Sequence, residues 1–151
     1  MRSELVKGII QLEPSDPPLI PRPPFGNDAA FAFGLTDLAI GYEPATGKDA
    51  ENMETTIEPV TDADHNDYIM QKSPAEQLTN LGKIPELFVT GEALCHAPYD
   101  RCAVRLLEQA GMDIEHADLG KEYIHFNGYM SFMERSNLQI ADRVCQWIQQ
   151  H

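Results

Sequence analysis

A strand–helix–strand pattern after Lys83 constrains the fold of this chain more than any other feature. Residues 84–91 are a short apolar run that ends at a glycine, which is typical of a buried strand. Residues 98–110 place apolar side chains at i, i+3 and i+4, with Pro98 in the first turn and Gly111 as the C-cap, which predicts a helix. Residues 112–119 predict another strand. Strands joined by a helical crossover lie parallel, so the pattern predicts an α/β fold.

Two further elements extend this unit at its ends. Residues 5–12 are mostly apolar and rich in β-branched side chains, as expected of a strand buried on both faces of a parallel sheet. A final helix is predicted from Ser136, whose spacing to Gln139 suits a capping box. We therefore expect a single domain of 151 residues with about three parallel strands and flanking helices.

The segment 14–83 interrupts this regular pattern. Six of the eleven prolines fall between Pro14 and Pro24, where fixed φ angles and missing N–H groups exclude a helix interior or a central strand. Residues 37–67 then carry nine acidic side chains against the single base Lys48, without a sustained period. We expect a loop or lid-like insertion over 14–83, and a mobile acidic loop without a task is the simplest interpretation of residues 37–67.

The charge balance narrows the choice of partners. Lys and Arg number 11 against 24 Asp and Glu, a net charge of −13 that repels phosphate backbones and anionic lipid surfaces. Neither a nucleic acid nor a membrane is an expected partner. The chain has no apolar run of the ~20 residues that cross a bilayer, and its start lacks an apolar signal core, so we expect a cytoplasmic location.

The cysteines predict neither a disulfide framework nor a metal site. Cys95, Cys102 and Cys145 are odd in number and lack C-x-x-C spacing, and we expect all three to be small buried apolar residues. His96 and Asp100 flank one helix start, but two ligands are too few for a metal centre.

The loops that leave the carboxyl ends of the predicted strands are the expected place for chemistry. Glu13 and Glu92 follow two of these strands, and the loop 121–133 after the third contains aromatic residues and His125. A carboxylate that fixes an imidazole, which takes a proton from a serine, is the arrangement of a nucleophilic hydrolase. No serine of the sequence has the flanking glycines of a G-x-S-x-G turn. Glu92 is a candidate for a second acid near the site, although its simpler interpretation is a solvated loop charge.

Four stretches, in their order along the chain, resemble the carboxyl-terminal half of an α/β-hydrolase: residues 4–14, 34–37, 85–93 and 124–147. The resemblance covers most of the chain. The chain is most similar to fungal esterase-like proteins, relatives of bacterial esterases whose catalytic acid lies in a Leu-Glu-Pro turn. The resemblance implies a partial α/β-hydrolase fold and cleavage of acyl esters through a serine, without a metal or an organic cofactor. It also implies a setting in fungal secondary-metabolite biosynthesis.

The resemblance assigns roles to individual positions. Glu13 in Leu12-Glu13-Pro14 matches the family's catalytic acid, and Tyr129 stands where the family has its histidine, while His125 matches a second histidine. A phenol with an unperturbed pKa of ~10 is no ordinary base at neutral pH. Glu13, His125 and Tyr129 are therefore the catalytic candidates, with Phe126, Asn127 and Glu92 as the substrate-binding candidates.

We expect an incomplete or degenerate hydrolase, because the family's serine turn precedes the region that this chain matches. One alternative is a non-catalytic module that binds a small molecule or a protein between residues 14–24 and 125–129. Another is a fragment whose amino-terminal half was lost in gene prediction. If the sheet lacks the strands that precede this region in the family, the strand at 5–12 has an unpaired edge. Such an edge predicts a homo-oligomer unless another segment covers it.

Overall fold

A parallel sheet of three strands forms the centre of the molecule, as the computed structural model shows for residues 3–14, 41–45, 53–61 and 67–151. The strand order is β1-β4-β5, with β1 at Ile9–Leu12, β4 at Glu86–Thr90 and β5 at Ile114–Asp118. Helix α1 (Ala97–Gln109) connects β4 to β5, and helix α2 (Asn137–Gln150) follows β5. Short 3₁₀ turns lie at Ser3–Leu5 (η1) and Ser131–Met133 (η2). The predicted α/β class with three parallel strands is confirmed.

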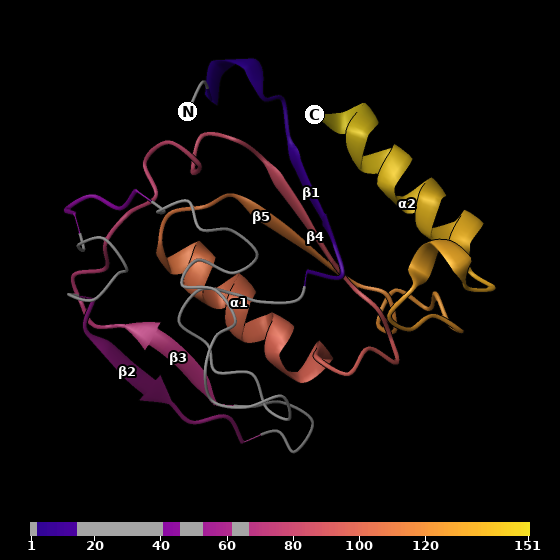
Figure 1. Ribbon diagram of the computed structural model, residues 1–151, viewed down its shortest axis with the longest axis horizontal. Helices are drawn as coiled ribbons and strands as arrows, with labels where there is room; N and C mark the ends of the chain where they lie inside the picture. Colours follow the sequence, from indigo (N-terminus) through magenta and orange to yellow (C-terminus); the bar gives the residue numbers. More distant parts are fainter. Residues whose placement is uncertain (1–2, 15–40, 46–52, 62–66) are drawn as a thin grey trace.

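The alternation of side chains along β4 divides the core into two layers. All five residues of β4 are buried, as expected of the central strand of a sheet with helices on both faces. Leu87 and Val89 pack in the same cluster as Ile140 and Trp147 of α2. Phe88 points to the other face and packs against Ala103 and Val104 of α1. Figure 1 accordingly shows the two helices on opposite sides of the sheet.

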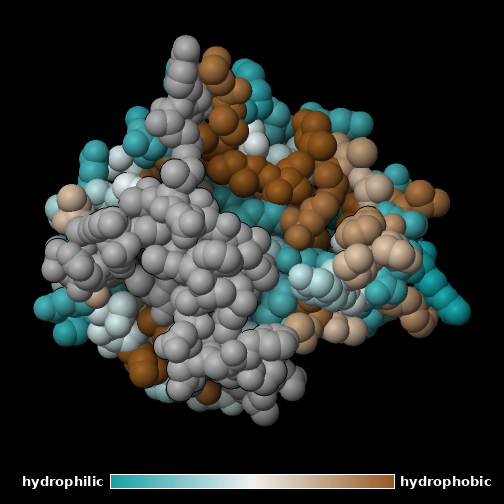
Figure 2. Space-filling model, viewed as in Figure 1, coloured by the Kyte–Doolittle hydropathy of each residue, from teal (hydrophilic) through white to brown (hydrophobic). Residues whose placement is uncertain are grey.

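Strand β1 differs from the strand expected at 5–12. It begins at Ile9, its first three residues are only partly buried, and Leu12 is half exposed. It pairs with β4, and no other described strand lies along its second edge. The expectation of burial on both faces is therefore wrong for these residues. Figure 2 shows a continuous hydrophobic area over β1 and between β1 and α2.

The expected insertion contains regular structure that the sequence pattern did not predict. Strands β2 (Thr55–Glu58) and β3 (Tyr68–Gln71) form an antiparallel ribbon. The side chain of Gln109 joins this ribbon to α1, because its Oε1 accepts the N–H of Gln71 at 2.8 Å and its Nε2 donates to the carbonyl of Gln71 at 2.9 Å. Residues 15–40, 46–52 and 62–66, with most of the proline-rich stretch, lie outside the described residues.

Two local predictions need correction. Ser136 precedes α2 but makes no side-chain capping bond, so the predicted capping box does not form. The cysteines also differ from the prediction, since Cys95 and Cys145 are exposed and only Cys102 is buried. Within the described ranges, no helix is both long and apolar enough to cross a membrane.

Candidate active site

The loops after β4 and β5 meet at the carboxyl edge of the sheet. β4 ends at Thr90 and leads into Gly91 and Glu92, while β5 ends at Asp118 and leads into the long loop before α2. The two strands are parallel neighbours, so their carboxyl ends lie at the same edge. This arrangement brings together Glu92 and His125, which stand 33 residues apart in sequence.

Glu92 and His125 form a carboxylate–imidazole pair. The Nδ1 atom of His125 donates to Oε1 of Glu92 at 2.7 Å, and the main-chain N–H of Phe126 donates to Oε2 at 3.1 Å. The hydrogen bond from His125 is the main reason that the pKa of Glu92 is lowered from its ordinary value. Among the described residues, Nε2 of His125 has no hydrogen-bond partner. The pair therefore leaves one imidazole nitrogen available to another group.

The backbone around His125 is strained. Tyr123 has a φ of 61° and Phe126 a φ of 66°, so two bulky residues in the left-handed region flank the histidine. Each costs about 1–2 kcal/mol, and such residues persist only where the surroundings hold them. The bond from the Phe126 N–H to Glu92 is one such restraint. The turn presents His125 to the carboxylate at a conformational cost, which is typical of functional sites.

A shallow pocket lies beside this pair. Its volume is about 460 Å³, and its lining combines charged and uncharged groups of the two loops: Glu92, Ala93, Phe126, Asn127, Gly128, Glu134 and Arg135. The same loop exposes a group of large apolar side chains: Tyr123, Phe126, Tyr129, Met130, Phe132 and Met133. An apolar molecule that reaches His125 would therefore meet apolar surface.

Glu13, the acid implied by the resemblance, lies beside Gly91, the residue before Glu92. It follows β1 with a left-handed φ of 50°, and its side chain is buried. Its Oε2 accepts the N–H of Ser131 at 3.5 Å, whereas Oε1 has no hydrogen-bond partner among the described residues. Burial raises the pKa of this carboxyl. The Leu-Glu-Pro turn thus reaches the aromatic loop, but the carboxylate that contacts His125 is Glu92 and not Glu13.

The remaining candidates from the sequence, Tyr129, Asn127 and Phe126, do not contact His125 in the same way as Glu92 does. Tyr129 is 59% exposed, and its ring meets that of His96 edge-on at 6.3 Å between centroids. In the described part of the chain, no hydrogen bond or ring contact joins Tyr129 to His125. Asn127 is buried, and both ends of its amide are bonded to protein groups. Phe126, by contrast, is exposed beside the pocket.

A buried polar network supports the start of α1. His96 donates from Nδ1 to Oδ1 of Asp100 at 2.9 Å, and the hydroxyl of Thr90 donates to Oδ2 at 2.7 Å. That hydroxyl also bonds to Nε2 of His116 at 2.9 Å, and burial is the main reason that the pKa of His116 is lowered. His96 and Asp100 are thus joined to each other. Of the residues that the structure describes, no group of three or more has the arrangement to hold a metal ion.

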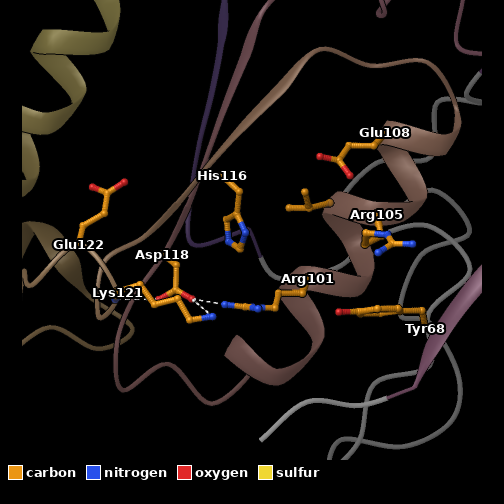
Figure 3. Close-up of a pocket in the computed structure, with 9 residues that line it drawn as sticks. Tyr68, Arg101, Arg105, Glu108, His116, Asp118, Lys121 and Glu122 are labelled. Carbon is orange, nitrogen blue, oxygen red and sulfur yellow. Dashed lines mark hydrogen bonds and ion pairs between the residues drawn. The ribbon is translucent and has the colours of Figure 1, made fainter. Parts of the chain in front are cut away.

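A second pocket lies between α1 and β5 (Figure 3). It encloses about 420 Å³, and most of its charged side chains are paired. Arg101 and Lys121 both point toward Asp118, at 2.9 Å and 3.4 Å, and Arg105 lies 3.6 Å from Glu58. The lining holds as many cations as carboxylates, Arg101, Arg105 and Lys121 against Glu108, Asp118 and Glu122, so these charges sum to zero and the pair at Glu92 remains the better candidate site.

Comparison with known proteins gives one close relative. The chain is 46% identical over 148 residues to the probable secreted lipase phiG of a fungal species (strain ATCC 74256). The chain is related to a lipase-like hydrolase. The match covers 98% of this chain but 40% of the relative, so the chain spans less than half of that protein's length. No family model and no solved structure matches.

The same comparison corrects the expected location. We predicted a cytoplasmic protein from the absence of an apolar signal core at the start of the sequence. The relative is named as a probable secreted lipase, and this name contradicts that prediction.

Both members of the pair were candidates from the sequence, but no sequence feature joined them. Glu92 stands one residue beyond the strand predicted to end at Gly91, the same kind of position as Glu13, and was interpreted as a substrate contact, a second acid near the site or a solvated charge. Strand-end position is the signal that could have found it. No sequence rule gives the distance between two loops, so the pairing with His125 required the structure.

Proposed function

We propose that this chain carries the acid and the base of a lipase-like ester hydrolase, with Glu92 as the acid and His125 as the base. The observation that supports the proposal is the 2.7 Å bond between Glu92 Oε1 and His125 Nδ1 at the carboxyl edge of a parallel sheet. A carboxylate on Nδ1 fixes the tautomer of the imidazole and stabilises its protonated form. Nε2 is then the nitrogen that accepts the proton of a hydroxyl nucleophile.

The relative supports the reaction class. Its name describes a lipase, and lipases cleave carboxylic esters, so the substrate proposed here is an acyl ester. The exposed apolar side chains beside His125 suit the apolar part of such a substrate. The relative's name also favours a secreted protein. A role in fungal secondary metabolism rests on the family resemblance alone.

Turnover of a p-nitrophenyl butyrate ester tests this proposal. We expect the purified chain to release p-nitrophenol, in contrast to the incomplete hydrolase expected from the sequence. His125→Gln should lower the rate by about 10²–10⁴-fold, because a positioned base contributes roughly that factor, and Glu92→Gln should lower it less. Glu115→Gln is the matched control, since Glu115 is an exposed carboxylate that contacts Arg143 on α2. A fluorophosphonate probe with peptide mapping identifies the serine that acts as nucleophile.

Two results would contradict the proposal. Equal rates in the wild type, His125→Gln and Glu92→Gln would exclude the pair from the reaction. Thermal stabilisation by an ester that is not turned over would instead favour the non-catalytic binding module.

A further inference from the structure

The side chain of Asn127 connects both halves of the candidate site. Its Oδ1 accepts the main-chain N–H of Glu92 at 2.6 Å, and its Nδ2 donates to the carbonyl of Ile124 at 2.7 Å and to the hydroxyl of Ser136 at 3.3 Å. Its own carbonyl accepts the N–H of Ala93 at 3.0 Å. One residue therefore joins the segment after β4, the turn that carries His125 and the start of α2.

The burial of Asn127 sets it apart from its neighbours. It is 3% exposed, whereas Phe126 beside it is 73% exposed. A buried amide is stable only when its donors and acceptor are bonded, and leaving one of them unpaired costs about 1–3 kcal/mol. A Cβ at Gly91 would lie 2.9 Å from Oε1 of Glu13 and 3.0 Å from the carbonyl oxygen of Gly128, so this glycine lets the loop around Asn127 approach closely. The local structure is thus arranged around an amide at position 127.

We propose that Asn127 is the positioning residue of the Glu92–His125 pair. The bond to the Glu92 N–H fixes the backbone from which the carboxylate extends. The bond to the Ile124 carbonyl fixes the residue before His125. The segment after β4 and the turn after β5 are in this way held at the separation that the 2.7 Å contact requires. The inference rests on the proposed function, and it gives Asn127 a role different from the substrate contact that the sequence suggested.

Only an amide of this length satisfies all these partners. An aspartate accepts from the Glu92 N–H but cannot donate to Ile124 or Ser136, and it adds a negative charge beside Glu92. An alanine makes neither contact. Asn137 supplies a matched control, because its amide also donates to a loop carbonyl, that of Phe132 at 3.3 Å, but it is exposed and does not touch the pair.

Nuclear magnetic resonance of the complete chain tests the proposal without requiring activity. The carboxyl ¹³C signal of Glu92 reports its pKa, and the imidazole ¹⁵N signals of His125 report the Nδ1–H bond. In the wild type we expect a lowered pKa for Glu92 and a bonded Nδ1–H. Asn127→Ala is expected to return the pKa of Glu92 toward its ordinary value and to remove the bonded Nδ1–H signal. Asn137→Ala is expected to leave both unchanged.

The outcomes separate a positioning role from a structural one. A folded Asn127→Ala or Asn127→Asp protein that keeps the lowered pKa of Glu92 and the bonded Nδ1–H overturns the proposal. If neither variant folds, Ser136→Ala decides, because it removes the 3.3 Å partner of Nδ2 alone. We expect it to shift the pKa of Glu92 by a smaller amount in the same direction, and no shift overturns the proposal. An ordinary Glu92 pKa in the wild type would instead reject the proposed function itself.

Discussion

The main-chain N–H of Ser131 donates to Oε2 of Glu13 at 3.5 Å, across 118 positions of the sequence. This long bond joins the end of β1 to the start of η2, and thereby ties the edge strand to the loop that carries His125. The other carboxyl oxygen of Glu13 is buried without a hydrogen-bond partner among the described residues. Burial outweighs the single N–H donor, so the pKa of Glu13 is raised above its ordinary value.

The stability of the protein should depend on pH through Glu13. A folded-state pKa above the unfolded one gives a contribution that is fully present below the unfolded pKa and is lost as the pH rises through the folded pKa. Glu13→Gln, which cannot ionise, is expected to remove this fall in the free energy of unfolding. Urea unfolding of both proteins across that pH window is the measurement.

Part of the fall should remain in this variant, because burial also raises the pKa of Glu86. The double variant with Glu86→Gln serves as the reference, and its stability should rise with pH, because the pKa values of Glu92 and His116 are lowered in the folded protein. Identical pH profiles for the wild type and Glu13→Gln would show that Glu13 has the same pKa in the folded and unfolded chains.

Gly8 is required by the contact between the start of β1 and α2. A Cβ at this position would lie 2.7 Å from Cη2 of Trp147 and 3.0 Å from Cζ3. Trp147 is a buried member of the core cluster and cannot move away freely. We expect Gly8→Ala to lower the free energy of unfolding by about 1–3 kcal/mol, the usual cost of overpacking. Chemical denaturation measures this change.

Gly41→Ala is the matched control for this substitution, because a Cβ there has no atom of the described residues within 4 Å. Its free energy of unfolding should stay within about 0.5 kcal/mol of the wild type, as for most surface changes. A Gly8→Ala protein as stable as the control would mean that β1 and α2 are not held against each other.

The elements that were predicted correctly from the sequence are those with a strong apolar pattern or with a glycine at their end. The predicted helix at 98–110 corresponds to α1, because its apolar spacing and the glycine at 111, which has a φ of +85°, specify both its face and its end. Strand β4 followed from a continuous apolar run. The ribbon of β2 and β3 was missed because all four residues of β2 are exposed, so that no side of it shows an apolar pattern.

For the candidate site, the sequence predicted the residues but not their contacts. Residue types and strand ends were enough to select Glu13, Glu92 and His125, but not to say which carboxylate meets the imidazole. That choice depends on two left-handed turn residues, Tyr123 and Phe126, whose conformation no propensity favours. It also depends on the buried amide of Asn127, in a stretch whose other features indicate an exposed loop. Tertiary contacts override local preference at these positions.

The three cysteines should react at different rates. Burial raises the pKa of the Cys102 thiol to about 11, whereas Cys95 and Cys145 are exposed. Because the thiolate is the reactive form, we expect rapid alkylation of Cys95 and Cys145 and slow alkylation of Cys102 in the folded protein. Peptide mapping after a short iodoacetamide pulse measures this. The urea-unfolded chain should label at all three positions, and equal labelling of Cys102 in the folded chain would contradict its burial.

The open edge of β1 predicts self-association of this chain. Leu5, Val6 and Leu12 are exposed along or beside an edge that no described strand covers, and unpaired strand edges recruit other strands. The net charge of −13 opposes association, so added salt should strengthen it by screening the repulsion. Sedimentation velocity over a range of protein and salt concentrations is the measurement.

A lysine on the edge strand should weaken this association, because a charged edge residue disfavours pairing with another strand. Leu12→Lys is therefore expected to shift the distribution toward monomer. Ile57→Lys is the control, since Ile57 is 67% exposed on β2, away from the parallel sheet. If the wild type sediments as one monomeric species at every concentration and salt level, the edge of β1 does not act as an interface between copies of this chain. If both lysine variants dissociate the oligomer equally, the effect is not specific to β1 and its edge is not the interface, since added positive charge alone should reduce the repulsion and strengthen association.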